Sequence, residues 1–226
     1  GDYISQINDK SVVEMNLSES VKIMRGAPGT KVKLTVLRDG ESKQLDFNII
    51  RENISIKTTR SKVYNDIIYL KINSFTEKAY PETLKNITSK IKEIGGEEKV
   101  KGIVLDLRGN PGGLLDQSIK ISELFLPSGK DIVFTKGKGD IILESFKSNN
   151  KKPLLDKVPM VVLINEGSAS ASEIVTGALQ DNKRAVVIGT KSFGKGSVQT
   201  IIPTPMDSAI KMTIARYYTP LGRSIQ

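Results

Sequence analysis

Hydrophobic and polar residues alternate over two stretches near the start of the chain, residues 31–37 and residues 44–50. A period of two is typical of β-strands that bury one of their faces. The Asp39-Gly40 pair between the two stretches is a strong turn signal, because glycine tolerates the positive φ that a tight turn requires. We therefore predict a β-hairpin in this part of the chain.

The residues before this hairpin predict one strand and one short helix. Residues 1–8 have the pattern of a strand end and a turn. Ser18 is a suitable N-cap for a helix that runs through Met24 and that Gly26 closes. Residues 1–53 are thus predicted to form a small β-rich unit, with too little chain for a well-filled core of its own.

From Ile54 onward the pattern changes to alternating strands and helices. The predicted strands are residues 67–72, 102–107, 160–164, 185–188, 197–202 and 209–217. The predicted helices are residues 80–94, a segment that follows residue 113 and ends near Phe125, and residues 170–180. Between them, residues 127–157 form a β-rich excursion with many Lys and Gly residues. This succession predicts an α/β sheet with helical cover over residues 54–226.

Composition narrows the possible chemistry. The 226 residues contain no Cys and no His, which excludes a disulfide framework and removes the two commonest partners of nucleophilic catalysis. A transition-metal site would need carboxylates alone, so we expect no metal and no cofactor. The longest apolar run, residues 158–164, is far short of the roughly 20 residues of a membrane helix. The chain opens at Gly1 without Met or a signal peptide, so we expect that an N-terminal region precedes it.

Net charge is +9, with 34 basic and 25 acidic residues. Such a balance attracts anionic wall polymers, lipid headgroups or nucleic acid. The lysines are dispersed and few aromatic residues lie among them, unlike a groove on which single-stranded bases stack. We expect an ordinary solvated surface and no nucleic-acid partner.

The segment Asn165-Glu-Gly-Ser-Ala-Ser-Ala-Ser-Glu173 carries the first candidate for chemistry. Ser170 lies where a buried strand meets a helix, between two alanines that let a substrate backbone approach. A helix N-terminus also offers unpaired N–H groups that stabilise an oxyanion. The alternative is a capping box, in which Ser170 caps the helix together with Glu173.

A lysine is the natural partner for a serine nucleophile in a chain without histidine, and Lys195 is the leading candidate. An exposed lysine is protonated near neutral pH, so a lysine base must be kept neutral, which burial among apolar groups achieves. Phe193 could exclude water from the amine, and Gln199 could orient the amine without adding charge. The alternative is an exposed lysine in a glycine turn.

Residues 189–195 also match the first seven positions of a phosphate-binding P-loop. The match fails at Gly196, where Ser or Thr should bind magnesium. The residues that follow predict a strand instead of the required helix, so we do not favour nucleotide hydrolysis.

A glycine pair at Gly112 and Gly113 follows another predicted buried strand. Exposed N–H groups in such a loop form an anion-binding nest, and either glycine is a natural second oxyanion donor beside the amide of Ala171. Asp106 and Arg108 could act as acid and electrophile. We favour a local ion pair that braces the loop.

Several segments, in order along nearly the whole chain, resemble the C-terminal processing peptidases, also called tail-specific proteases. They are Tyr69-Leu-Lys-Ile-Asn-Ser-Phe75, Gly102-Ile-Val-Leu-Asp-Leu-Arg-Gly-Asn-Pro-Gly-Gly-Leu114, Asn165-Glu-Gly-Ser-Ala-Ser-Ala-Ser-Glu-Ile174, Gly189-x-x-Ser-Phe-Gly-Lys-Gly-Ser-Val-Gln199 and Tyr218-Thr-Pro-Leu-Gly-Arg-Ser-Ile-Gln226. The resemblance implies a crotonase-like or ClpP-like α/β protease core over residues 54–226, truncated at its C-terminus. Residues 1–53 resemble the C-terminal half of a bacterial PDZ domain, a fold that binds peptide C-termini by strand addition.

Carried onto this sequence, the resemblance assigns the nucleophile to Ser170, the general base to Lys195 and the residue that orients the lysine to Gln199. Oxyanion donors would be the amides of Ala171 and of Gly112 or Gly113. These assignments describe a serine endopeptidase that forms an acyl-enzyme.

The resemblance also implies protein or peptide substrates with exposed C-terminal tails. It implies an extracytoplasmic place on a bacterial cell envelope, whether periplasmic, membrane-anchored or secreted, and it leaves open an anchor outside these residues and a homo-oligomer. Two other readings stay open at this point, a non-catalytic peptide-binding scaffold and an acyl-CoA enzyme on a similar core.

Overall fold

The computed structural model describes residues 1–53, 57–205 and 208–226. The chain divides into two compact units, Gly1–Ile56 and Lys57–Gln226. Residues 54–56, where the second domain was predicted to begin, lie outside the described residues. Within the described ranges, no helix is both long and apolar enough to cross a membrane.

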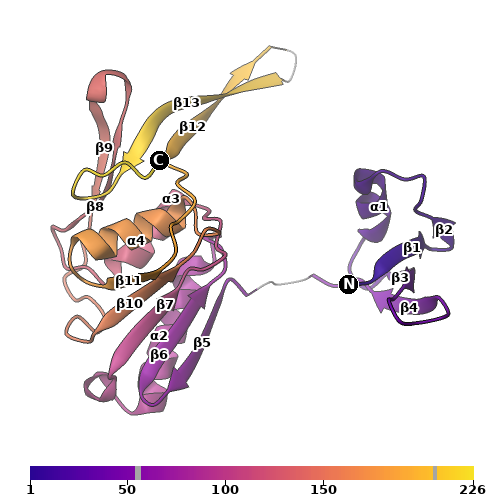
Figure 1. Ribbon diagram of the computed structural model, residues 1–226, viewed down its shortest axis with the longest axis horizontal. Coiled ribbons are helices and arrows are strands. Elements are labelled where there is room, and N and C mark those ends of the chain that lie inside the picture. The colour runs from indigo at the N-terminus through magenta and orange to yellow at the C-terminus, as the bar shows by residue number, and fades with distance from the viewer. Residues whose placement is uncertain (54–56, 206–207) are drawn as a thin grey trace. The chain divides into compact units, whose positions relative to one another are not determined.

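The first unit is a four-stranded sheet with one helix (Figure 1). Its elements are β1 (Tyr3–Ile7), β2 (Lys10–Ser11), α1 (Leu17–Met24), β3 (Lys31–Leu37) and β4 (Leu45–Ile50), with strand order β2-β1-β3-β4. The predicted hairpin is confirmed as the antiparallel pair β3 and β4. The predicted N-cap at Ser18 is wrong, because the side chain of Asn16 accepts from the N–H of Glu19 (2.9 Å) and caps the helix. Asn16 is the better cap because the Glu19 carboxylate also accepts from the N–H of Asn16 (3.0 Å), which completes a capping box.

This unit has a small core. Among its described residues the buried apolar side chains are Ile7, Val32 and Val36, and α1 has no buried residue. So few buried side chains stabilise a sheet weakly, as expected for a short segment.

The second unit is built on a five-stranded sheet with order β11-β10-β7-β6-β5. Its strands are β5 (Thr59–Tyr64), β6 (Ile67–Ile72), β7 (Gly102–Asp106), β10 (Met160–Ile164) and β11 (Val186–Gly189). Strands β6, β7, β10 and β11 are parallel, so their carboxyl ends meet at one edge of the sheet. The edge strand β5, which periodicity did not predict, pairs antiparallel with β6.

Three helices pack on one face of this sheet, namely α2 (Ala79–Ile94), α3 (Leu115–Glu123) and α4 (Ala171–Asp181). They share one hydrophobic cluster with alternate strand residues, among them Leu70, Leu105 and Val162, which are fully buried. α2 ends at Gly95, whose φ of 99° and N–H bonds to the carbonyls of the last turn form a left-handed C-cap. The core therefore fixes the helices, and with them the loops at the carboxyl edge.

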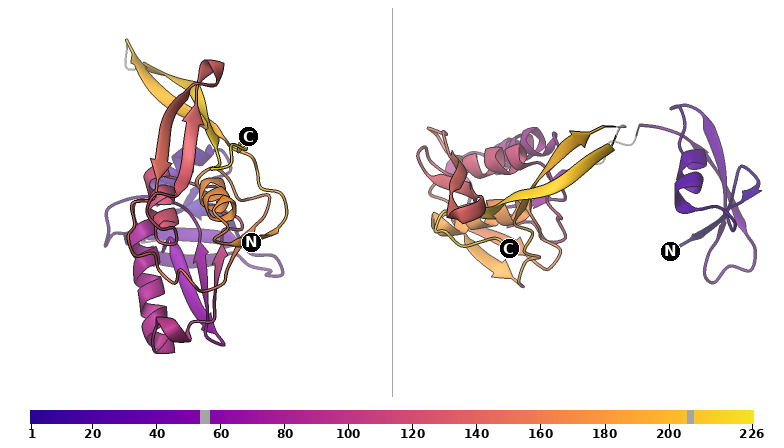
Figure 2. Two further views of the ribbon diagram at one scale, coloured as in Figure 1. Left: turned by 90° about the vertical axis from the view of Figure 1, so that its left-hand side faces the viewer. Right: turned by 90° about the horizontal axis from the view of Figure 1, so that it is seen from above.

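A second, antiparallel sheet with order β12-β13-β8-β9 rises from this layer (Figures 1 and 2). Its strands are β8 (Asp131–Lys136), β9 (Ile142–Lys147), β12 (Ser197–Thr204) and β13 (Ser208–Tyr218). Short 3-10 turns occur at Glu97–Lys99 and Lys138–Asp140. The predicted β-rich excursion at residues 127–157 is thus part of a sheet that the end of the chain completes.

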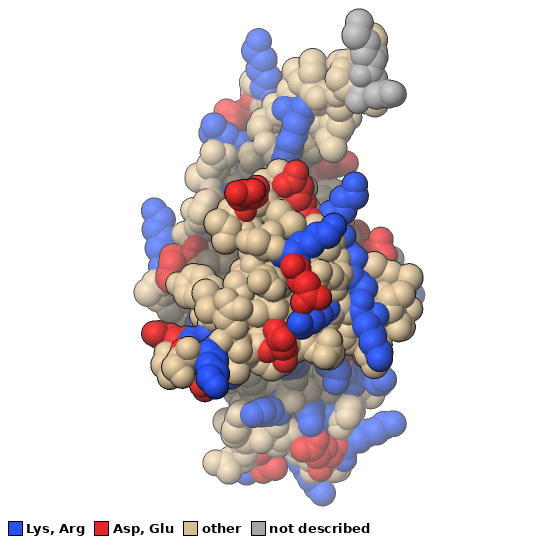
Figure 3. Space-filling view, turned by 90° about the vertical axis from the view of Figure 1, so that its right-hand side faces the viewer, with Lys and Arg blue, Asp and Glu red and all other residues tan. Residues whose placement is uncertain are grey.

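Charged side chains are intermixed on the face that Figure 3 displays. Lys and Arg stand among Asp and Glu there and do not gather into one basic patch, in keeping with the dispersed lysines of the sequence.

Candidate active site

Two loops at the carboxyl edge of the sheet are tied directly to each other. The loop after β7 contains Asn110, whose carbonyl accepts from the N–H of Ala169 (3.0 Å) and from the hydroxyl of Ser172 (2.9 Å). The side chain of Asn165 accepts from the N–H of Gly109 (2.8 Å). The predicted nucleophile segment and the predicted oxyanion loop therefore form one structure.

Ser170 occupies a strained position at the start of α4. Its φ of 56° and ψ of −113° place it in a region that residues with a side chain seldom adopt. In α/β-hydrolases a similar sharp strand-to-helix turn exposes a nucleophilic hydroxyl. Ser170 and Glu173 have the arrangement of a capping box, but the N–H of Glu173 donates to the backbone carbonyl of Ser170 (2.9 Å). The Ser170 hydroxyl has no hydrogen bond within the described residues, so it is left for other chemistry.

The two neighbouring serines are already engaged. Ser168 is fully buried and donates to the carbonyl of Leu107 (2.8 Å). Ser172 is also fully buried, and its hydroxyl donates to Asn110. Of the three alternating serines, only Ser170 is partly exposed. The structure therefore separates the candidates that the sequence places side by side.

The glycine loop lies against Ser170, and its two glycines differ in hydrogen bonding. The N–H of Gly112 donates to the side-chain oxygen of Asn110 (2.9 Å). Within the described residues, the N–H groups of Gly113 and Ala171 donate to no backbone or side-chain acceptor. These two amides are the ones available to an anion.

Glu173 connects Ser170 to the loop that carries Lys195. Its carboxylate accepts from the N–H of Ser170 (2.8 Å) and from the N–H of Lys195 (2.9 Å). The loop is held again where the N–H of Phe193 donates to the carbonyl of Ser168 (2.9 Å). The local sequence indicates only a capping role for Glu173, because no local pattern shows that a loop 22 positions later in the chain docks on the same carboxylate.

The side chains of the other predicted residues are open to solvent. Lys195 is exposed, and Phe193 is 69% exposed, so the burial expected around the amine is absent here. Gln199 is exposed on β12, and its side chain donates to the hydroxyl of Thr213 (3.5 Å) and not to Lys195. The structure brings the backbones of Ser170 and Lys195 together but leaves Gln199 unconnected to the lysine.

Asp106 and Arg108 form the local ion pair that we expected. The Asp106 carboxylate is 1% exposed and accepts from the Arg108 guanidinium (2.8 Å) and from the Tyr69 hydroxyl (2.6 Å). Burial alone raises the pKa of Asp106, but the hydrogen bonds from Arg108 and Tyr69 outweigh burial and hold the pKa below its ordinary value. The pair lies at the start of the glycine loop and braces it. This is the structural role that we favoured over a role for Asp106 as an acid.

The P-loop alternative fails in three dimensions as well. Residues 190–196 have no helix, and β12 follows as a strand that begins at Ser197. No helix N-terminus is therefore present at the end of this segment to receive a phosphate.

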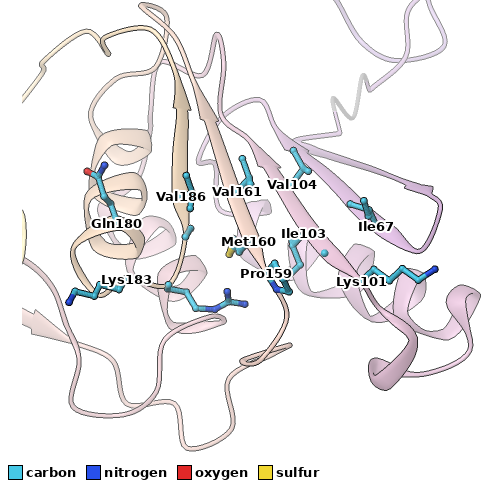
Figure 4. Close-up of a pocket in the computed structure, with 13 residues that line it drawn as sticks. Ile67, Lys101, Ile103, Val104, Pro159, Met160, Val161, Gln180, Lys183 and Val186 are labelled. Atoms are coloured by element: carbon cyan, nitrogen blue, oxygen red, sulfur yellow. The ribbon is translucent and has the colours of Figure 1, made fainter.

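One cavity lies near the carboxyl edge of the sheet, and another lies away from it. One of about 540 Å³ adjoins the Lys195 loop and is lined in part by Glu173, Phe193 and Gly194. A cavity of about 650 Å³ lies at the amino ends of the parallel strands, where Val104, Val161 and Val186 face it (Figure 4). None of the predicted site residues lines the second cavity, so we do not assign the chemistry to it. No group of three or more acidic side chains in the described ranges is placed to hold a metal ion.

Known proteins are similar to this chain in sequence and in fold. The chain is 49% identical over 231 residues to a carboxy-terminal-processing protease of Bartonella bacilliformis, which covers all of this chain and 51% of that protein. It is 40% identical over 226 residues to the carboxy-terminal processing protease CtpA of Bacillus subtilis, which covers 99% of this chain and 46% of that protein. Among solved structures, the photosystem II D1 C-terminal processing protease matches with a TM-score of 0.69 and 26% identity, over all of this chain and 60% of that one.

These matches give the family and the fold. The chain spans about half the length of the two relatives named here. The family model for peptidase family S41 matches residues 66–226, which include the serine segment, the glycine loop and Lys195. This chain therefore belongs to peptidase family S41.

Proposed function

We propose that the protein containing this chain is a serine endopeptidase in which Ser170 is the nucleophile and Lys195 is the general base. One observation supports the proposal above the others. Ser170 has a strained backbone, and its hydroxyl has no hydrogen bond within the described residues. Its N–H shares a carboxylate oxygen of Glu173 with the N–H of Lys195. A serine that only capped α4 would not need this second loop beside it.

The proposed reaction passes through an acyl-enzyme. The Ser170 oxygen attacks the carbonyl carbon of the scissile peptide while its proton moves to the neutral amine of Lys195. The resulting ammonium returns the proton to the leaving nitrogen as the C–N bond breaks, which leaves an ester on Ser170. Water then attacks the ester, again with Lys195 as base, and releases the new C-terminus.

The negative charge on the tetrahedral intermediate needs preorganised donors. Between the two candidate glycines we favour Gly113, because the Gly112 N–H already donates to Asn110. The N–H of Ala171, at the first position of α4, is the second donor, and the helix N-terminus adds a favourable dipole. The role of Gly112 is then to let the loop lie close to Ser170, because this glycine has no side chain.

Lys195 must lose water to act as a neutral base. In this structure its side chain is exposed, so we propose that a bound substrate covers the amine together with Phe193. Gln199 would turn toward Lys195 in that state, since its hydrogen bond to Thr213 is long, at 3.5 Å. The assignment of Gln199 rests on family resemblance and on its place on β12.

Substrate choice and location are proposed from the relatives. Two of them are named as carboxy-terminal processing proteases, so we propose that this protein acts on exposed C-terminal tails of proteins. Residues 1–53 would contribute the C-terminal half of a PDZ domain to tail recognition. We place the enzyme outside the cytoplasm, on a bacterial cell envelope; detection of the complete protein only in the cytoplasmic fraction would refute that placement.

A serine-directed fluorophosphonate probe tests the dyad. We expect the wild type to be labelled and to cleave a tail peptide, and we expect Ser170→Ala and Lys195→Ala to do neither. Normal cleavage by Ser170→Ala would refute the assignment of the nucleophile. A binding scaffold without catalysis predicts no labelling of the wild type, and this outcome would replace the proposed function.

A further inference from the structure

We infer that Glu173 is a positioning residue of the peptidase, which holds the nucleophile and the base in register without contacting substrate. The inference rests on the proposed function of Ser170 and Lys195. It concerns how the two residues are kept together, which the chemistry of the dyad does not determine.

One carboxylate accepts four hydrogen bonds. Oε2 of Glu173 accepts from the N–H groups of Ser170 (2.8 Å) and Lys195 (2.9 Å). Oε1 accepts from the N–H of Gly194 (2.7 Å) and from the hydroxyl of Ser192 (2.7 Å). Because Oε2 is shared, the backbone nitrogens of Ser170 and Lys195 can be no farther apart than these two bonds allow. A carboxylate has about four acceptor sites, so this group is saturated.

Capping a helix does not explain this arrangement. In α1, Glu19 occupies the same position of a capping box and accepts from the N–H of Asn16 (3.0 Å). Glu19 is exposed, and no other hydrogen bond to its carboxylate occurs within the described residues. Glu173 is 7% exposed and binds a distant loop. Burial of a carboxylate is costly unless several donors satisfy it. Three of the four donors to Glu173 come from the Lys195 loop, so the contact with that loop is what allows the burial.

The charge of Glu173 suits its four donors. A carboxylate only accepts, and hydrogen bonds to it are roughly twice as strong as those between neutral groups. Glutamine at this position would have an NH₂ group in place of one carboxylate oxygen. That group cannot accept, so the two hydrogen bonds to that oxygen would be lost. The Lys195 loop would then lose its register with Ser170, and a displacement of about 1 Å can lower turnover by about 10²-fold.

The test compares variants of the complete protein for tail-peptide cleavage, rate of fluorophosphonate labelling and thermal unfolding. Glu173→Gln is the main variant. Glu166→Gln is the matched control, because Glu166 is exposed on the same segment and accepts from Thr190 (3.1 Å) at the start of the same loop. Glu173→Asp keeps the charge but is one methylene shorter, and it serves if the glutamine variant does not fold.

For folded Glu173→Gln we expect kcat and the labelling rate to fall by about 10²-fold with KM little changed. Glu173→Asp should lose at least tenfold in kcat, and Glu166→Gln should behave as wild type. A purely structural role would lower the unfolding temperature and leave the labelling rate of folded molecules unchanged, and that result would overturn the inference.

Ser170→Ala separates this inference from the proposed function. If Ser170→Ala is inactive while folded Glu173→Gln, or folded Glu173→Asp in its place, keeps wild-type kcat, the dyad stands and the role of Glu173 is refuted. If Ser170→Ala keeps wild-type cleavage, the dyad fails and the inference fails with it.

Discussion

Gly112 lies so close to Ser170 that a Cβ atom on the glycine would come within 2.8 Å of the Ser170 Cβ. The same atom would be 2.7 Å from the carbonyl oxygen of Ala169. Real Cβ atoms do not make such contacts, so the backbone of the glycine loop passes beside Ser170 only because this residue has no side chain. The φ of Gly112, +99°, imposes the same requirement.

Gly112→Ala should therefore disable the site. We expect its fluorophosphonate labelling to fall by about 10²-fold, because the loop must move away from Ser170. Gly109→Ala is the control, since Gly109 also has a positive φ, +70°, but no atom lies within 4 Å of its added Cβ. That control should lose about 1–2 kcal/mol of stability from backbone strain and keep its labelling rate. Equal labelling by the two variants would contradict the packing argument.

The three alternating serines should separate into two classes. Ser168→Ala and Ser172→Ala each remove a fully buried hydroxyl that donates to a backbone carbonyl. Each should lose about 0.5–1.5 kcal/mol of stability, because the carbonyl loses one of its two donors. Labelling of the folded fraction should persist in both. Ser170→Ala should unfold at a temperature near that of wild type and show no labelling. If labelling is instead lost in folded Ser168→Ala and kept in Ser170→Ala, the nucleophile is Ser168.

Replacing the lysine by a chemically modified cysteine tests the base directly. The chain has no Cys of its own that the reagent would also modify. Lys195→Cys introduces the one thiol of these 226 residues and should lower kcat by about 10³-fold or more. Alkylation with 2-bromoethylamine then rebuilds a lysine-like amine on that thiol, and we expect it to restore most of the activity. Lys191→Cys, at an exposed lysine of the same loop, should be active before and after alkylation. No recovery in alkylated Lys195→Cys would argue against an amine base at this position.

The buried ion pair beneath the glycine loop predicts a dependence of stability on pH. Hydrogen bonds hold the pKa of Asp106 below its ordinary value of 3.8. A carboxyl whose pKa is lower in the folded than in the unfolded chain stabilises the fold above its unfolded pKa, and this contribution disappears as pH falls through the folded value. We expect Asp106→Asn to cost about 2 kcal/mol near pH 7. The difference from wild type should shrink in denaturant titrations below about pH 4.

The control for this experiment is the pair of Asp66 with Lys101 (2.8 Å), in which both side chains are exposed. Asp66→Asn should change stability by less than about 1 kcal/mol at any pH, because water screens the pair. A stability difference for Asp106→Asn that stays constant down to pH 2 would show that the carboxylate charge is not what stabilises the loop.

Periodicity predicted most elements because their local patterns and their burial agree. The strand predicted at residues 160–164 is β10, with the same bounds, and the helix predicted at residues 80–94 begins one residue earlier, at Ala79. The prediction failed where two local signals compete, as at the cap of α1, where Asn16 and Ser18 both suit the N-cap. It also gave no sign of β5, because a half-exposed edge strand has a weak pattern.

By itself, the sequence determined the order of strands and helices, the chemistry that the absence of Cys and His leaves open, and the motifs that contain Ser170 and Lys195. These properties reside in local pattern and composition. Only the tertiary structure decided that Glu173 joins the two loops and, among the described residues, which serine hydroxyl and which glycine amide lack a hydrogen-bond partner. Such contacts link residues up to 62 positions apart, and they depend on packing at the carboxyl edge of the sheet that no local pattern encodes.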